Sequence, residues 1–128
     1  MLNIYVLEDH FIQQNRIEEV IHTILKKNNI KVGDFEVFDK PNQLLDFYYR
    51  ARSHQLFFLD IQIKDDTKKG LEVAKQIRKS DPYANIVFFT THSEYLPLTF
   101  QYQLAALDFI DKSLECETFK SVWKVLSY

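Results

Sequence analysis

The feature that most constrains the fold is a regular alternation of short apolar runs with longer amphipathic runs. Apolar side chains recur at helical spacing between the short runs, as at Ile17, Ile21 and Ile24. Repeated strand–helix units predict parallel strands, because each helix must return the chain to the same edge of the sheet. The short runs predict five strands, at 3–7 (NIYVL), 35–38 (FEVF), 56–59 (LFFL), 86–89 (IVFF) and 105–110.

The predicted helices follow each of these strands. One contains the apolar stripe from Ile17 to Leu25, one begins near Pro41, and one places Leu71 and Ile77 on a common side before closing at residues 80–82. Two more are expected around 96–102 and 119–126. A closed eight-fold barrel needs about twice this length. We therefore expect an α/β fold with a doubly wound five-stranded parallel sheet in the order 2-1-3-4-5.

Length and charge exclude several classes of protein. The 128 residues suit one domain, and a net charge of −2 gives no basic excess for binding nucleic acid. A single cysteine, Cys116, cannot form an internal disulfide, which suits a reducing compartment. No signal peptide or run of about 20 apolar residues is present, so we expect a cytoplasmic protein that makes no membrane contact.

Polar and charged residues follow the predicted strands where each strand ends. Glu8 and Asp9 come after the first strand, Asp60 after the third, Thr90 and Thr91 after the fourth, and Lys112 after the fifth. The carboxyl ends of parallel strands meet at one edge of the sheet, and ligands bind there. A single aspartate after a strand is usually a turn or capping residue. The combination of acids, hydroxyls and a lysine at one edge favours a functional site.

Neighbouring strands lie about 4.8 Å apart, so the acids after the first and third strands are expected to crowd one pocket. Crowded carboxylates repel one another, and a bound divalent cation relieves that repulsion. Oxygen ligands in an incomplete protein cage favour Mg²⁺, which keeps several waters and often bridges to a phosphate. Lys112 would add positive charge, and the threonine hydroxyls would donate to an anionic oxygen.

These motifs resemble the receiver domain of bacterial two-component response regulators, a family with a CheY-like fold. The matching stretches are LEDH at 7–10, FFLDIQI at 57–63, KGLEVAKQIR at 69–78, IVFFTTHSE at 86–94 and ALDFIDKS at 106–113. Within that family, the sequences of these stretches are similar to those of the quorum-sensing regulators of the AgrA/ComE/BlpR type, and most similar to BlpR and ComE. The resemblance covers essentially the whole chain.

The resemblance implies a role for each site residue. Asp60 would be the phosphoryl acceptor, Asp9 and Asp60 direct Mg²⁺ ligands, and Glu8 a ligand through a bound water. The remaining positions would be the Gln62 backbone carbonyl on the metal, Thr90 as the hydroxyl switch, Thr91 near the phosphoryl group, Lys112 as its binding lysine and Phe109 as the aromatic switch. Receivers commonly have proline after that lysine, where this chain has Ser113, so the loop geometry there stays open.

Three other functions share parts of this pattern. A haloacid-dehalogenase-like phosphatase needs an acid two residues after the nucleophile, where this chain has Gln62. A nucleotide-binding Rossmann domain needs a glycine-rich turn, and Glu8-Asp9 would repel a pyrophosphate. A phosphorylation-independent interaction module with a receiver fold remains the alternative, although the intact acids, Thr90 and Lys112 oppose it. Nothing in the sequence decides the roles of His10, His92 or Cys116.

The expected partners follow from the same resemblance. A sensor histidine kinase would supply the phosphoryl group, and phosphorylation would promote a homodimer through an interface that includes Tyr95, Phe100 and Tyr102. The resembled regulators continue into a LytTR DNA-binding domain. We therefore expect residues 1–128 to be the receiver domain of a longer protein that controls transcription, with DNA contacted only through the part not present here.

Overall fold

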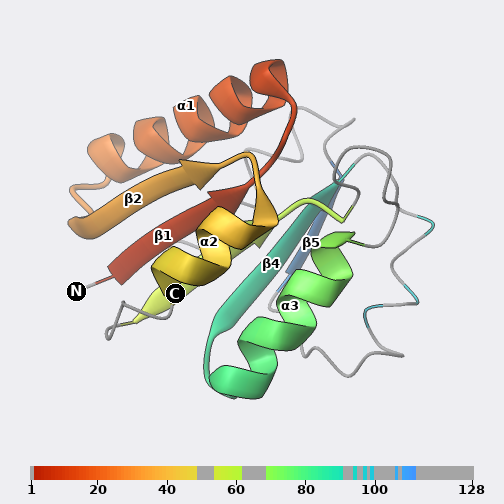
Figure 1. The fold of residues 1–128 in the computed structure, drawn as a ribbon. Helices are drawn as coiled ribbons and strands as arrows, with labels where there is room; N and C mark the ends of the chain where they lie inside the picture. Colours follow the sequence, from red (N-terminus) through yellow and green to blue (C-terminus); the bar gives the residue numbers. More distant parts are fainter. Residues whose placement is uncertain are drawn as a thin grey trace.

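The computed structural model describes residues 2–48, 54–61, 69–90, 94, 97, 99, 106 and 108–111 of the chain. Five strands form one sheet in the order β2-β1-β3-β4-β5, and every neighbouring pair is parallel (Figure 1). The predicted fold class and strand order are confirmed. The strands are β1 (Leu2–Leu7), β2 (Val32–Phe38), β3 (Gln55–Leu59), β4 (Asn85–Thr90) and β5 (Asp108–Asp111).

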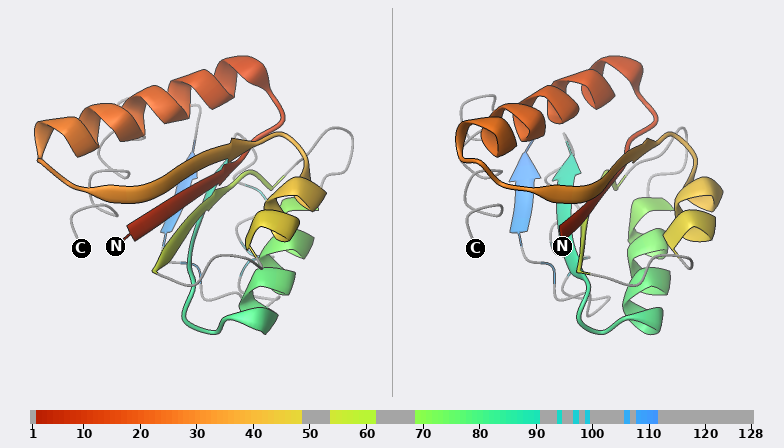
Figure 2. Two further views of the ribbon diagram at one scale, coloured as in Figure 1. Left: turned by 60° about the vertical axis from the view of Figure 1, so that its left-hand side comes forward. Right: turned by 90° about the vertical axis from the view of Figure 1, so that its left-hand side faces the viewer.

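Three helices are described, and they cover both faces of the sheet. They are α1 (Phe11–Lys27), α2 (Pro41–Tyr48) and α3 (Lys69–Ser80). Helix α1 lies on one face, and α2 and α3 lie on the other (Figure 2). The helices predicted around 96–102 and 119–126 fall almost entirely outside the described residues.

Alternate residues of the central strands supply the two halves of the core. Ile4 and Phe58 pack with α1 residues such as Ile21, whereas Tyr5 and Phe57 pack with α2 and α3. The continuous apolar runs of β3 and β4 are buried on both faces, as predicted for internal strands of a parallel sheet. Burial of both faces of β1, β3 and β4 makes these three strands the centre of the hydrophobic core.

Two strands begin three residues away from their predicted starts, and the other strand boundaries differ by at most one residue. Strand β2 begins at Val32 rather than at residue 35, because pairing with β1 continues past Gly33 and Asp34, which have low strand propensity. The register shifts between Leu2 and Ile4, and the Asp34 amide donates to the Asn3 side-chain oxygen at 2.8 Å. Strand β5 begins at Asp108 rather than at residue 105, and the described residue Ala106 precedes it.

Helix α3 begins in close contact with the end of β3. The Gly70 amide donates to the Ile61 carbonyl at 2.7 Å. A Cβ atom at Gly70 would lie 1.8 Å from the backbone oxygen of Asp60 and 2.7 Å from the Cα of Ile61. Both obstacles are backbone atoms, which a side-chain rotation cannot move. Only glycine therefore lets α3 start so close to the segment that carries Asp60.

We predict that Gly70→Ala destabilises the domain by about 3 kcal/mol or more, because the new methyl group forces helix and strand backbones apart. Gln76→Ala is the matched control, since Gln76 is exposed in the middle of the same helix and its loss should cost less than about 0.5 kcal/mol. Urea unfolding of both variants measures the difference. Equal stability of the two variants would show that the close approach at Gly70 is unimportant.

Candidate functional site

Two acidic residues follow β1, and hydrogen bonds to its backbone hold the first of them, Glu8. The Glu8 amide donates to the Phe38 carbonyl at 3.0 Å, so the β1–β2 ladder extends one residue beyond β1. The Gln14 side-chain amide donates to the Glu8 carbonyl. Glu8 is completely buried and Asp9 is half-buried. His10, the exposed N-cap of α1, makes no side-chain cap hydrogen bond. The turn from β1 into α1 is therefore held by hydrogen bonds to the end of β2 and to a side chain of α1.

Asp60 is held in the same way at the end of β3. Leu7 pairs with Leu59 in the parallel register, and the Asp60 amide donates to the Leu7 carbonyl at 3.0 Å. Asp60 is only 6% exposed. Because the ladder continues past both strands, the acids after β1 and β3 occupy neighbouring positions at the carboxyl edge of the sheet.

The three acids form one cluster. One carboxylate oxygen each from Glu8, Asp9 and Asp60 lies within 4.8 Å of the others. Two unit charges at that distance repel by about 3.5 kcal/mol at an effective dielectric constant of about 20. Two of the three residues are buried, so water screens them less than it screens surface acids. The donor set, three carboxylates and no nitrogen or sulfur, fits a hard cation such as Mg²⁺.

Thr90 is the last residue of β4 and is completely buried. Phe88 of β4 pairs with Leu59 of β3. In the direction of the strands, Thr90 therefore lies one residue beyond the level of Asp60, at the same carboxyl edge. On its other side, β4 neighbours β5, and there Thr90 pairs with Asp111. The structure thus brings Thr90 to the same edge of the sheet as the acidic cluster, as the sequence predicts.

Several predicted residues lie outside the described part of the chain. Phe109 is placed on β5 opposite Phe88 by its backbone alone. The backbone of β5 ends at Asp111, immediately before the predicted phosphate-binding lysine. The predicted site residues outside the described residues are Gln62, Thr91, Tyr95, Phe100, Tyr102 and Lys112, together with Ser113 and with His92 and Cys116, whose roles stay open.

Sequence reasoning missed three features around the acids. Gln14 holds the Glu8 carbonyl, and no sequence signal marks this contact. Phe11 and Ile12, in the first turn of α1, are 73% and 67% exposed. Their position off the apolar stripe of α1 was a readable signal, because apolar residues outside such a stripe face solvent. Gly70, at the start of α3, is one of two glycines in the sequence, and nothing in the sequence marks its contact with the backbone of Asp60.

Comparison with known proteins agrees with this site. The family model described as "Response regulator receiver domain" matches residues 4–123. Accessory gene regulator protein A from Staphylococcus aureus is 33% identical over 111 residues, which cover 87% of this chain and 46% of that protein. The protein of the same name from Staphylococcus epidermidis is 34% identical over the same shares. The chain thus spans about half the length of the curated relatives it matches.

Solved structures share the fold over nearly the whole chain. The response regulatory domain of protein mrkE from Klebsiella pneumoniae has a TM-score of 0.72 at 23% identity, covering 99% of this chain and 98% of that one. Response regulator TrrA from Thermotoga maritima, in complex with Mg(2+)-BeF, has a TM-score of 0.69 at 25% identity, covering 98% and 99%. Among the described residues, no helix is both long and apolar enough to cross a membrane.

The order of the strands, the acids at the carboxyl edge and the match over residues 4–123 all lead to one assignment. The chain belongs to the receiver-domain family of two-component response regulators.

Proposed function

We propose that this receiver domain accepts a phosphoryl group on Asp60 from a sensor histidine kinase and passes the signal on by a change of conformation. The observation that carries the proposal is the position of Asp60. It is nearly buried, fixed by the β1–β3 ladder, and within 4.8 Å of two more carboxylates. Such a site suits transfer chemistry that depends on positioning and electrostatics rather than on covalent help from the protein.

Glu8, Asp9 and Asp60 are the residues that would hold Mg²⁺, with Glu8 acting through a bound water and the Gln62 backbone carbonyl as a further ligand. The clustered carboxylates support this assignment, as does the complex of the similar receiver TrrA with Mg(2+)-BeF. Bound there, Mg²⁺ would supply positive charge that offsets the carboxylates and shields phosphoryl oxygens.

In the proposed step, an Asp60 carboxylate oxygen forms a bond to phosphorus while the phosphorus–nitrogen bond of the kinase phosphohistidine breaks. The histidine leaves with the electron pair of that bond, and the product is an acyl phosphate on Asp60. We assign Lys112 to binding a phosphoryl oxygen, Thr90 to donating its hydroxyl to another, and Thr91 to the space beside the phosphoryl group. Movement of Thr90 toward the acyl phosphate would let Phe109 turn inward and reposition the chain that follows β4.

We predict that incubation with acetyl phosphate and Mg²⁺ adds the mass of one phosphoryl group to the wild-type protein and none to Asp60→Ala. Asp39→Ala is the matched control, because Asp39 also comes directly after a strand at the carboxyl edge but is exposed. Intact-mass spectrometry measures the product. Full labelling of Asp60→Ala would contradict the assignment, and no labelling of the wild type would favour the phosphorylation-independent module.

We also propose that the kinase docks on the first turn of α1. Phe11 and Ile12 are the two most exposed large apolar residues of α1, and they follow the acidic cluster by two and three residues. Adjacent apolar side chains at the mouth of a site suit the buried centre of a protein interface. A kinase helix resting there would bring its phosphohistidine over Asp60.

The double variant Phe11→Ala/Ile12→Ala should accept phosphoryl groups from a phosphorylated kinase about tenfold more slowly, because it loses two apolar interface anchors. Its labelling by acetyl phosphate should stay unchanged, since the small donor needs no docking surface. Tyr83→Ala is the control, because Tyr83 is 90% exposed but follows α3 at the opposite edge of the sheet. Equal slowing with both donors would place the defect in the acidic site rather than in docking.

The output that we propose is a phosphorylation-dependent homodimer that contains Tyr95, Phe100 and Tyr102. The similarity to accessory gene regulator protein A supports control of quorum-sensing genes in the cytoplasm through a C-terminal LytTR DNA-binding domain. A dimer would place two such domains on paired DNA half-sites. Sedimentation with and without a phosphoryl mimic tests this output, and a monomer in both states at high concentration would refute it.

A further inference from the structure

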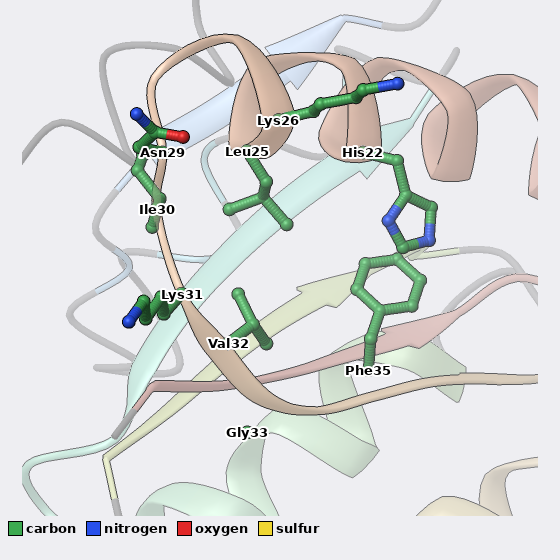
Figure 3. Close-up of a pocket in the computed structure, with 9 residues that line it drawn as sticks. All are labelled: His22, Leu25, Lys26, Asn29, Ile30, Lys31, Val32, Gly33 and Phe35. Carbon is green, nitrogen blue, oxygen red and sulfur yellow. The ribbon is translucent and has the colours of Figure 1, made fainter.

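A second concave site lies at the other edge of the sheet, between the end of α1 and the start of β2. Helix α1 begins beside the acidic cluster and runs back along the sheet, so its last turns lie at the amino edge (Figure 1). A pocket of about 700 Å³ opens there, within the size range of small-molecule sites. This α1–β2 pocket is lined by His22, Leu25, Lys26, Asn29, Ile30, Lys31, Val32, Gly33 and Phe35 (Figure 3).

The wall of the pocket is apolar. Leu25 from α1 and Val32 from β2 point toward one another, and the His22 ring lies over the Phe35 ring with centroids 4.3 Å apart (Figure 3). Leu25 belongs to the core beneath α1, and Ile30, Val32 and Phe35 pack against that core while staying partly exposed. Apolar surface that water can reach in this way favours binding an apolar group.

The backbone at the end of α1 is already engaged in hydrogen bonds. The Asn28 amide and the Asn28 side chain both donate to the Ile24 carbonyl, at 3.2 and 2.9 Å. The Ile30 amide donates to the Leu25 carbonyl at 2.9 Å, and Asn29 takes the left-handed conformation with φ 53° that ends the helix. The amides of Asn28 and Ile30 are therefore not available to a ligand, and the charge at the rim comes from side chains.

Those side chains are positive or neutral. The exposed Lys26 and Lys31 line the pocket, and its nine lining residues include no carboxylate. A carboxylate oxygen of Glu18 lies 3.7 Å from His22 Nε2, but Glu18 does not line the pocket. The acids of β2, Asp34 and Glu36, act on the opposite face of the sheet. Burial first, and then the charges of Asp34 and Glu36, raise the pKa of Tyr5, which packs with α2 and α3.

We propose that the α1–β2 pocket binds a small amphiphilic carboxylate, with its apolar body against Leu25, Val32 and Phe35 and its carboxylate at the rim, paired with the amine of Lys26 or of Lys31. The charge of the rim selects an anion, and the partly exposed apolar wall selects an apolar body. The proposal does not depend on phosphorylation, since the pocket and the acidic cluster lie at opposite edges of the sheet.

The test is an NMR titration of the ¹⁵N-labelled chain with octanoate and, separately, with the neutral octanamide. Octanoate should shift amide signals from His22 to Phe35 and leave those around Glu8 and Asp60 in place, whereas octanamide should bind at least about fivefold more weakly. The pair Lys26→Gln/Lys31→Gln should lose about fivefold in octanoate affinity, as expected for the loss of one exposed ion pair of about 1 kcal/mol.

The control pair Lys27→Gln/Lys75→Gln removes two exposed lysines that do not line the pocket, and its octanoate affinity should match the wild type. Three results would each overturn the proposal. They are shifts spread over unrelated surfaces, equal binding of octanoate and octanamide, and unchanged octanoate binding after the loss of Lys26 and Lys31.

Discussion

The hydrogen bonds that continue the parallel ladders past β1 and β3 place the acidic cluster. The amide of Glu8 is tied to β2, and the amide of Asp60 is tied to the carbonyl of Leu7. These bonds fix the backbone segments that bring one carboxylate oxygen each of Glu8, Asp9 and Asp60 within 4.8 Å of the others, an arrangement that the acids would not adopt by themselves. Burial of both faces of β1, β3 and β4 supplies the stability that offsets this repulsion.

The segments around the cluster adapt to that placement. Gly70 lets α3 begin against the backbone of Asp60, and Gln14 ties the first turns of α1 to the carbonyl of Glu8. Both helices that leave the site are thus anchored to the residues that form it. A change in charge at Asp60 would therefore act on two helices whose first turns are fixed to the site.

Much of the fold and part of the site were predictable from the sequence, for identifiable reasons. The runs LFFL and IVFF are apolar throughout and predict buried strands, and Pro41 marks the first residue of α2 as expected. Glu8, Asp9 and Asp60 were expected to meet because parallel strands align their carboxyl ends. The start of β2 was missed because Gly33 and Asp34 interrupt its pattern, while Asn3 from the neighbouring strand supports them. The contact of Gln14, the closeness of Gly70 to Asp60 and the α1–β2 pocket depend on packing between segments, which spacing along the chain does not encode.

The central claim is that Glu8, Asp9 and Asp60 form one divalent-cation site. Titration of the ¹⁵N-labelled chain with Mn²⁺ tests it most directly, because the paramagnetic ion broadens the amide signals nearest to it. The account predicts that signals around Glu8, Asp9, Asp60 and Gly70 broaden first, that excess Mg²⁺ reverses the effect, and that Asp9→Asn weakens it strongly. Broadening that begins instead around other acids such as Asp34 and Glu36, or a pattern unchanged in Asp9→Asn, would contradict the account.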